Sequence, residues 1–444
     1  MTARAWKYAE SFTQVARDIE SVHYKGRVTR VIGLIIEAYL PKVPVGAMCD
    51  VAKDDGEFIR GEVIGLREST AVLMLIGDTT GIHVGNEVTV ISKVATVKVG
   101  DGLLGRILDG NGDIADDGPR VACLKKYSLY SPVTPAIKRK LIDEPLPLGV
   151  RALDGFMTAA VGQRMMIMAG SGVGKSTLLG MIARNSSSDV NVIGLIGERG
   201  REVREFIERD LGEEGLRKSV IVVATSDAPA LVRMRAAFVT TTIAEYYRDK
   251  GLKVLLMMDS LTRFAMATRE VGLSLGEPPT TKGYTPSLFS ILPKLLERAG
   301  TTEHSGSITG LYTVLTEADD IQDPIADAVR SIVDGHIVLS RKLNTMGHYP
   351  PIDVLQSLSR VMTNVVSPEH GDASVKLRKC LALYAEAEDF IKIGIYQPGK
   401  NEELDEAVNK QKDIATFLKQ SVNEKTSYAD CENWLSKITC DLKG

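Results

Sequence analysis

The 444-residue sequence has few of the features that mark secreted, zinc-binding or membrane-spanning proteins. Its five cysteines are scattered without a CxxC pair, and its six histidines form no HExxH motif. A disulfide framework or a zinc site is therefore not expected, and a reducing compartment fits this cysteine usage. The first residues lack the apolar core of a signal peptide. The longest apolar stretches, such as 31–40 with Glu37 inside it, fall short of the ~18 residues that a membrane span needs. We expect a cytoplasmic protein.

The chain also lacks an excess of charge of either sign. It has 54 Lys and Arg against 57 Asp and Glu, a formal net charge of −3. A near-neutral total disfavours a general polyanion binder, although it leaves room for a local basic patch. Apolar residues make up 44% and charged residues 25%, which excludes collagen-like, mucin-like and largely disordered chains. At about 150 residues per domain, the length suggests roughly three domains.

The first 97 residues contain a segment with apolar residues at helical spacing, followed by a β-rich region. Apolar residues recur at helical spacing over 2–22, so we expect an amphipathic helix within 1–25. It could pack on its own domain, or it could dock on another protein or a membrane surface. Short β-rich runs at 27–36, 71–76 and 87–91 then predict a small β-barrel or sandwich over 26–97.

The remainder of the chain changes from an alternating to a helical pattern. A turn-rich stretch at 99–119 follows the β-rich region. Apolar runs then alternate with helical segments, which predicts an α/β domain with a mostly parallel sheet over 98–368. The candidate strands are Met165–Met168, Asn191–Ile196, Val220–Thr225, Val254–Met258 and Ser307–Val314. A charged, helical domain is expected over 369–444, with one helix at 404–422.

The candidate strand Met165–Met168 leads directly into a glycine-rich turn that ends in Lys-Ser-Thr and continues as a helical pattern. Glycines let backbone N–H groups converge on phosphate oxygens, and the following helix adds its positive end. Lys175 would bind the β- and γ-phosphates, and the Ser176 hydroxyl would bind Mg²⁺. The residues expected to hold the nucleotide are Ala169, Gly170, Ser171, Gly172, Val173, Gly174, Lys175, Ser176 and Thr177.

Two details refine this phosphate loop. Ala169 stands where the GxxxxGK[ST] pattern has its first glycine. Lys175 stands where a GxGxxG motif beginning at Gly170 would need its third glycine, which disfavours a dinucleotide site. The loop thus predicts binding of a nucleoside triphosphate, but it does not specify the class of NTPase.

Two acidic residues follow other candidate strands. Asp259 ends the buried run 253–258, where a carboxylate can hold Mg²⁺, although such an Asp can also simply cap the next helix. Glu198 emerges after the strand 191–196, where a carboxylate can orient the water that attacks a phosphate. The alternative for Glu198 is an ordinary residue of a charged surface loop. The 84 residues between Lys175 and Asp259 leave room for two strands, as in RecA-like motors.

Four segments together resemble the rotary-ATPase catalytic-subunit group. They read AGSGVGKST, GERGREV, VLLMMDSLTRFA and TEADDIQDPIADAVRSIVDGHIVLSR. Within that group, AGSGVGKSTLLGMIAR and DVLQSLSRVM are most similar to the protein-export ATPases of flagella and type III secretion systems, a branch that also carries the alanine at position 169. The segment GRVTRVIGLIIEA favours the flagellar branch. The resemblance extends from about residue 26 to residue 399.

This resemblance implies an N-terminal β-barrel, a central RecA-like P-loop domain, a C-terminal helical domain and a homo-hexamer that binds ATP between subunits. Glu198 matches the glutamate that activates water, and Arg199 follows it as in the family and should contact the site. Asp259 matches the acid on the Mg²⁺ side. Arg360 matches the arginine finger that reaches the neighbour's γ-phosphate, and Tyr349 matches the aromatic that stacks on adenine, although each could be an ordinary surface or packed residue.

The resemblance also implies partners. Residues 276–287 look like a pore-facing loop for a central stalk-like protein or a passing substrate, and the N-terminal helix matches a docking helix for a peripheral regulator. An export gate, chaperones and export substrates would follow, with peripheral association at the inner membrane. No nucleic acid is expected.

Three other functions stay open at the level of sequence. The chain could be the ATPase of a virulence injectisome. A nucleic-acid motor of the Rho type would need a basic, aromatic-bearing channel, which the net charge of −3 disfavours. A non-catalytic ring subunit would lack Glu198. Because one chain carries both Glu198 and Arg360, we expect a homo-hexamer to complete each active site with the next protomer.

Overall fold

The computed structural model describes residues 24–122, 125–316, 323–440 and 442. The predicted amphipathic helix at 2–22 lies outside these residues. The described chain forms two compact units. One comprises the residues up to Thr96 with Ser128–Tyr130 and Ser274–Gly276, and the other comprises the rest. A small two-stranded sheet pairs β7 (Thr96–Val99) with β9 (Lys125–Ser128).

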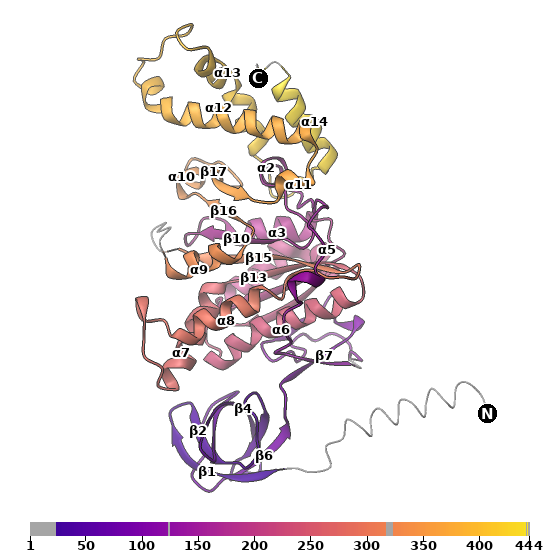
Figure 1. Ribbon diagram of the computed structural model, residues 1–444, viewed down its shortest axis with the longest axis vertical. Coiled ribbons are helices and arrows are strands. Elements are labelled where there is room, and N and C mark those ends of the chain that lie inside the picture. The colour runs from indigo at the N-terminus through magenta and orange to yellow at the C-terminus, as the bar shows by residue number, and fades with distance from the viewer. Residues whose placement is uncertain (1–23, 123–124, 317–322, 441, 443–444) are drawn as a thin grey trace, which may run out of the picture. The chain divides into compact units, whose positions relative to one another are not determined.

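The first unit is a closed β-barrel with the strand order β1-β2-β5-β4-β3-β6 (Figure 1). The strands are β1 (Lys25–Ile32), β2 (Ile35–Tyr39), β3 (Met48–Ala52), β4 (Phe58–Arg67), β5 (Thr70–Leu75) and β6 (Glu87–Ser92). Alternate residues such as Val88 and Val90 in β6 are buried, because successive side chains of a strand point to opposite faces. The choice between a barrel and a sandwich is thus resolved in favour of the barrel.

The predicted β-run at 27–36 is two strands and not one. Gly33 has a φ of +58°, a left-handed conformation that glycine adopts without the steric cost other residues meet. The chain reverses there, and Val31 of β1 pairs with Ile36 of β2. Hydrophobic content alone did not reveal this turn.

The second unit is built on a sheet with the strand order β17-β16-β10-β15-β13-β11-β12-β8, in which β14 also pairs with β15. All neighbouring pairs along this order are parallel except β16 with β17, which are antiparallel. The strands are β8 (Ile107–Asp109), β10 (Arg164–Ala169), β11 (Val190–Ile196), β12 (Ser219–Ala224), β13 (Lys253–Asp259), β14 (Gly300–Thr301), β15 (Ser307–Leu315), β16 (Gly335–Leu339) and β17 (Ile352–Ser359). The five predicted strands are therefore confirmed, while β8 lies inside the stretch at 99–119 expected only to form turns.

Helices pack against this sheet, and α6 contacts β11, β12 and β13. The helices before the C-terminal domain are η1 (Asp101–Leu103), η2 (Ala136–Lys138), α2 (Arg151–Phe156), α3 (Lys175–Asn185), α4 (Gly200–Glu205), the π-helical η3 (Phe206–Leu211), α5 (Gly212–Arg217), α6 (Ala230–Asp249), α7 (Leu261–Ser274), η4 (Thr281–Gly283), α8 (Pro286–Leu296), α9 (Pro324–Ile332), α10 (Arg341–Thr345) and α11 (Met362–Val365). None of the described helices is long and apolar enough to cross a membrane.

The C-terminal domain consists of α12 (Pro368–Lys392), α13 (Glu402–Leu418) and α14 (Tyr428–Thr439), which pack on one another (Figure 1). Each begins at a polar residue whose side chain accepts a hydrogen bond from the backbone of the first turn, namely Ser367, Asn401 and Ser427. Such caps satisfy N–H groups that have no partner within the helix. The helical domain expected from the sequence is confirmed.

The predicted helix at 404–422 extends too far, because α13 ends at Leu418. The backbone of the residues after Leu418 forms hydrogen bonds with other parts of the chain. The carbonyl oxygen of Lys419 accepts a hydrogen bond from the Arg151 guanidinium, and the backbone N–H of Gln420 donates to the carbonyl oxygen of Tyr349 at 2.9 Å. Tertiary hydrogen bonds therefore replace the helical ones at this point.

Aromatic packing joins the C-terminal helices to α2. Phe417 is fully buried, and its ring meets Phe156 and Trp434 edge-on, at centroid distances of 6.0 and 5.5 Å. The Arg151 guanidinium lies over the Trp434 ring at 4.8 Å. The hydrophobic core of the α/β sheet thus continues into the C-terminal domain.

We predict that Phe417→Ala lowers the free energy of unfolding by about 3–5 kcal/mol, because it leaves a cavity between the aromatic side chains of Phe156 and Trp434. Phe390 on α12 is 56% exposed, so Phe390→Ala is the matched control, with a change under about 1 kcal/mol. Urea unfolding followed by circular dichroism measures both. Equal losses for the two variants would contradict this packing.

Candidate active site

The phosphate loop connects β10 to α3 and depends on Gly174. Gly174 has a φ of +97° and precedes the first residue of α3. A Cβ there would lie 3.0 Å from the ring of Tyr349. Glycine is therefore required both by the backbone conformation and by the aromatic side chain beside it. The Tyr349 hydroxyl also donates to the Gly174 carbonyl oxygen at 3.4 Å.

Lys175 begins α3 and reaches two carboxylates. Its Nζ forms ion pairs with Asp259 and, at 3.4 Å, with Glu198. Burial alone would lower the pKa of Lys175, but the charges of Asp259 and then Glu198 outweigh it, so this pKa is raised. The amine therefore stays protonated and offers a fixed positive charge beside the loop.

The sheet explains why residues so distant in sequence meet. Asp259 ends β13 and Glu198 follows β11, and these neighbouring parallel strands pair Leu195 with Asp259. Carboxyl ends of parallel strands converge at one edge, where open α/β sheets bind ligands. Asp259 also accepts a hydrogen bond from the Thr313 hydroxyl of β15 at 2.7 Å. Sequence reasoning missed Thr313, because a threonine within a buried strand carries no signal of its own.

Glu198 has an unusual environment for a carboxylate. Burial, followed by the negative charge of Asp259, raises the pKa of Glu198 from 4.5 to about 6, although the charge of Lys175 opposes this. A cavity of about 10 Å³ adjoins Ser176, Glu198 and Asp259, roughly the room that one water molecule needs. A group whose pKa lies near neutrality, next to a space of this size, can accept a proton from a water molecule.

The loop residue Thr177 lies close to two other side chains. Its hydroxyl lowers the pKa values of Asp210 and Tyr349, although burial raises each of them more. Burial raises the pKa of Tyr349, so its hydroxyl stays protonated. Because the Tyr349 carbonyl accepts the Gln420 N–H, the residues after α13 hold the aromatic that lies against the phosphate loop.

Two predicted residues lie away from this cluster. The side chain of Arg199 is 75% exposed and pairs with Glu202 at 3.5 Å. Arg360 is exposed and follows β17, which β16, β10 and β15 separate from β13 in the sheet. The expectation that Arg199 contacts the site stays a prediction.

Two further arginines lie close to the site and were not singled out from the sequence. Arg341 donates to the carbonyl oxygen of Ser171 in the loop at 3.2 Å. The side chain of Arg263 on α7 packs against Gly197, since a Cβ on that glycine would come within 2.6 Å of the arginine's own Cβ. Among the described residues, the buried Nε of Arg263 has no hydrogen-bond partner. The sequence signal that could have identified Arg263 is its position four residues after Asp259, in the first turn of the following helix.

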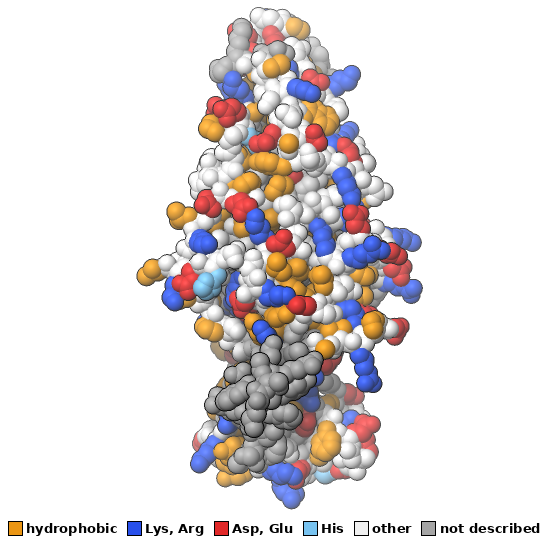
Figure 2. Space-filling model, turned by 90° about the vertical axis from the view of Figure 1, so that its right-hand side faces the viewer, with side chains coloured by type: hydrophobic (Ala, Val, Ile, Leu, Met, Phe, Trp, Pro, Cys, Tyr) orange, Lys and Arg blue, Asp and Glu red, His pale blue; other side chains and the backbone are white. Residues whose placement is uncertain are grey.

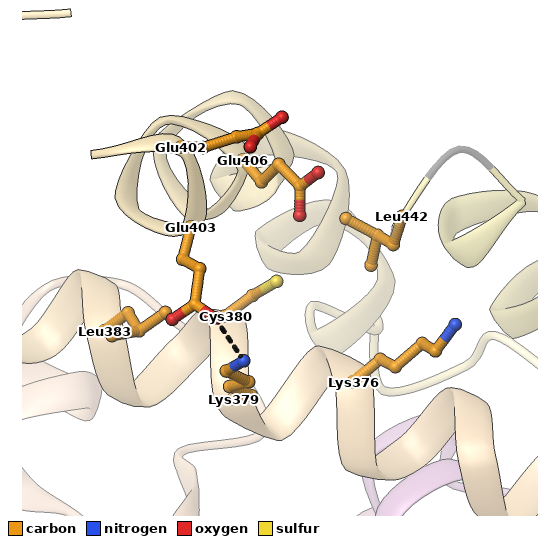
Figure 3. Close-up of a pocket in the computed structure, with 8 residues that line it drawn as sticks. All are labelled: Lys376, Lys379, Cys380, Leu383, Glu402, Glu403, Glu406 and Leu442. Carbon is orange, nitrogen blue, oxygen red and sulfur yellow. Dashed lines mark hydrogen bonds and ion pairs between the residues drawn. The ribbon is translucent and has the colours of Figure 1, made fainter. Parts of the chain in front are cut away.

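The larger cavities lie elsewhere and have different chemistry. One of about 220 Å³ lies between α12 and α13 and is lined by charges of both signs, Lys379 and Glu403 forming an ion pair at 2.8 Å (Figure 3). A cleft of about 370 Å³ between α10, β17 and the C-terminal helices is mainly apolar. The described residues contain no cluster of His, Cys, Asp or Glu able to hold a metal by itself. Size alone therefore does not identify the catalytic centre, whereas the charge arrangement around Lys175 does.

The surface charge is mixed. On the face in Figure 2, Lys and Arg side chains are interspersed with Asp and Glu over the described part of the chain. A channel for single-stranded nucleic acid would need a continuous basic track, so this face does not support such a channel.

Comparison with known proteins identifies the family. Residues 149–359 match the model of the ATP synthase alpha/beta family, nucleotide-binding domain, and residues 28–90 match the beta-barrel domain of that family. Residues 366–437 match the T3SS EscN ATPase C-terminal domain. The flagellum-specific ATP synthase of Bacillus subtilis is 51% identical over 417 residues, 93% of this chain and 95% of that one. The chain belongs to the ATP synthase alpha/beta family.

Relatives from both export systems resemble this family member closely. The type 3 secretion system ATPase of Xanthomonas euvesicatoria is 48% identical over 94% of both chains. The solved structure of the assembled ATPase EscN from enteropathogenic E. coli superimposes with a TM-score of 0.88 at 47% identity, covering 93% of this chain and 99% of that one. EscN in complex with its central stalk EscO gives a TM-score of 0.87 at 46% identity, with the same coverage. The chain is therefore an ATPase of the export branch, as its sequence motifs predicted.

The raised pKa of Glu198 predicts a pH-dependent loss of stability. Below pH 4.5 the residue is protonated in both the folded and the unfolded chain. Between pH 4.5 and about 6 the unfolded chain releases this proton first, so folding loses stability as the pH rises. Without nucleotide, Glu198→Gln should therefore be more stable than the wild type at pH 8, by no more than about 2 kcal/mol, and equally stable at pH 4.

Thermal unfolding at the two pH values measures this difference. Glu205→Gln, which removes a carboxylate from the exposed ion pair with Arg201, is the matched control and should show no such gain. A wild type as stable as Glu198→Gln at pH 8 would contradict the electrostatic environment described for Glu198.

Proposed function

We propose that this chain is the ATP-hydrolysing motor of a flagellar-type export apparatus, which uses hydrolysis to release chaperones and to unfold and deliver export substrates. The observation that carries this proposal is the buried Lys175 between Asp259 and Glu198, at the mouth of a phosphate loop. The ATPase of a virulence injectisome is the second candidate. It is favoured by the 48% identity to the Xanthomonas enzyme.

The substrate ATP would lie along the loop from Ala169 to Thr177, with its phosphates near the backbone N–H groups and Lys175. Phosphate oxygens would compete with Asp259 and Glu198 for the Lys175 ammonium, and so release both carboxylates for their roles in the reaction. Tyr349, which lies against Gly174, would stack on the adenine. Arg263 and Arg341 would add positive charge beside the phosphates.

The donors beside Lys175 suit Mg²⁺, which prefers hydroxyl and carboxylate oxygens. The Ser176 hydroxyl and the Asp259 carboxylate would hold it, and it would neutralise charge on the phosphates. Glu198 would orient the attacking water and accept its proton, which requires the deprotonated form that predominates above its pKa of about 6.

Arg360 would act on the neighbouring subunit. It lies at the sheet edge far from the Lys175 cluster of its own chain, and its side chain is exposed. An arginine at a neighbour's γ-phosphate neutralises developing charge, which is worth on the order of 10³–10⁵ in rate. A homo-hexamer in which each subunit supplies one Glu198 and one Arg360 would need no second kind of subunit. Arg199, exposed in the isolated chain, would face such an interface as well.

The protein partners are proposed on the same basis. The assembled structures of EscN, with and without its central stalk EscO, support a ring with a stalk, and we assign residues 276–287 to the stalk or the passing substrate. The segment 2–22 would bind a peripheral regulator and bring the motor to the export gate at the inner membrane. No nucleic acid partner is proposed.

Mixing two inactive variants tests the shared active site. We expect Glu198→Gln and Arg360→Ala to lower ATP turnover by at least about 100-fold each, with nucleotide binding retained. Co-assembled rings of the two should regain a substantial part of the activity, because at some interfaces an intact Glu198 meets an intact Arg360. Phosphate release measures turnover, and Arg201→Ala, on the exposed face of α4, is the control. Mixed rings without recovery would contradict this assignment.

A charge reversal tests the assignment of residues 276–287. Lys282 is half exposed and pairs with Asp323 at 3.4 Å. Lys282→Glu should weaken binding of the stalk protein by at least about tenfold while leaving basal ATP turnover within about twofold, since a rim charge mainly affects association. Co-sedimentation with the purified stalk protein measures binding. Lys379→Glu, on α12, is the control, and unchanged stalk binding by Lys282→Glu would count against the assignment.

A further inference from the structure

Among the residues that the structure describes, none forms a hydrogen bond or ion pair with the Arg360 side chain, so its position depends on its backbone. It stands immediately after β17, and its N–H donates to the carbonyl oxygen of Asp334 at 2.9 Å. An arginine side chain has about 2 kcal/mol of rotamer entropy, so an unanchored one would rarely occupy a single productive position. The direction of its Cα–Cβ bond therefore depends in part on what fixes Asp334.

Asp334 is fixed by Arg164 through both backbone and side chain. The Asp334 N–H donates to the Arg164 carbonyl oxygen at 2.8 Å. In return, the Arg164 N–H and Nε donate to Oδ2 of Asp334 at 3.0 and 3.2 Å, and a terminal guanidinium nitrogen donates to Oδ1 at 3.3 Å. The Arg164 side chain is 14% exposed and that of Asp334 24%. Planar arginine–carboxylate pairing of this kind is directional as well as strong.

Neighbouring residues make this support rigid. Gln163 is fully buried, and its side-chain amide donates to the Ser359 hydroxyl at 2.9 Å, one residue before Arg360. Arg164 also forms an ion pair with Glu297, which follows α8. Gly335 of β16 pairs with Ser359 of β17. The backbone that carries Arg360 is therefore held by Gln163, which precedes β10, and by β16, while Glu297 after α8 contacts only Arg164.

We propose that the Arg164–Asp334 pair is a positioning device for Arg360 in hydrolysis by the neighbouring subunit. The pair touches no nucleotide of its own subunit, because Arg164 begins β10 and the phosphate loop follows the other end of that strand, about 20 Å away. Asp334 and Arg164 thus act in trans, through Arg360. This inference rests on the proposed role of Arg360 and adds two residues that serve it.

The test uses full-length chains in mixed rings. Asp334→Ala alone should lower kcat at least about tenfold, since a displacement near 1 Å in a reacting group can cost about 100-fold, and should leave the KM for ATP within about twofold. Co-assembled with Glu198→Gln, it should regain activity as Arg360→Ala does. Co-assembled with Arg360→Ala, it should regain none, because both chains then lack a working arginine.

A matched control separates positioning from loss of stability. Arg106 and Asp116 form a similarly buried pair next to β8, at the other edge of the same sheet, with side chains 9% and 20% exposed. Asp116→Ala should lower the melting temperature about as much as Asp334→Ala does, yet keep kcat within about twofold. The milder Asp334→Asn, which preserves one acceptor oxygen, should lie between the wild type and Asp334→Ala in kcat.

The outcomes distinguish the positioning role of Asp334 from the proposed trans role of Arg360. If Arg360→Ala is rescued by Glu198→Gln but Asp334→Ala is not, Asp334 damages its own subunit and the positioning role is wrong. Wild-type kcat in Asp334→Ala, or an equal loss in Asp116→Ala, would also overturn it. If Arg360→Ala itself is not rescued, the trans role of Arg360 fails, and the role of Asp334 fails with it.

Discussion

A single buried cation organises the catalytic centre of this chain. Lys175 lies where the phosphate loop becomes a helix, and it draws together two carboxylates from the ends of two other strands. Asp259 and Glu198 would otherwise repel each other within a poorly hydrated space, and burial, followed by that repulsion, still raises the pKa of Glu198. The parallel order of the sheet is what delivers all three groups to one edge.

Much of this arrangement follows from sequence alone. The loop from Ala169 to Thr177 and the apolar run that ends in Asp259 carry strong local signals. Strand existence was predictable because buried parallel strands read as continuous apolar runs. The roles of Glu198 and Arg360 came from resemblance, since a charged residue after a strand has no distinguishing pattern.

The features that escaped prediction depend on contacts distant in sequence. The three-residue strand β8 exists because Ile107–Asp109 pairs with β12, more than a hundred residues later. The helix α13 ends four residues early because Gln420 bonds to Tyr349. Thr313 and Asp334 matter only through their partners, Asp259 and Arg164. Local propensity does not contain this information, because tertiary hydrogen bonds decide between otherwise similar backbone conformations.

The backbone hydrogen bond from Gln420 to Tyr349 links the C-terminal domain to the catalytic centre. The Gln420 side chain also accepts from the Arg151 N–H and donates to the Gly149 carbonyl oxygen, so the segment after α13 is fastened at several points. A displacement of the C-terminal helices would therefore move Tyr349, whose ring lies against Gly174. In the other direction, a nucleotide that displaced Tyr349 would also displace the segment after α13.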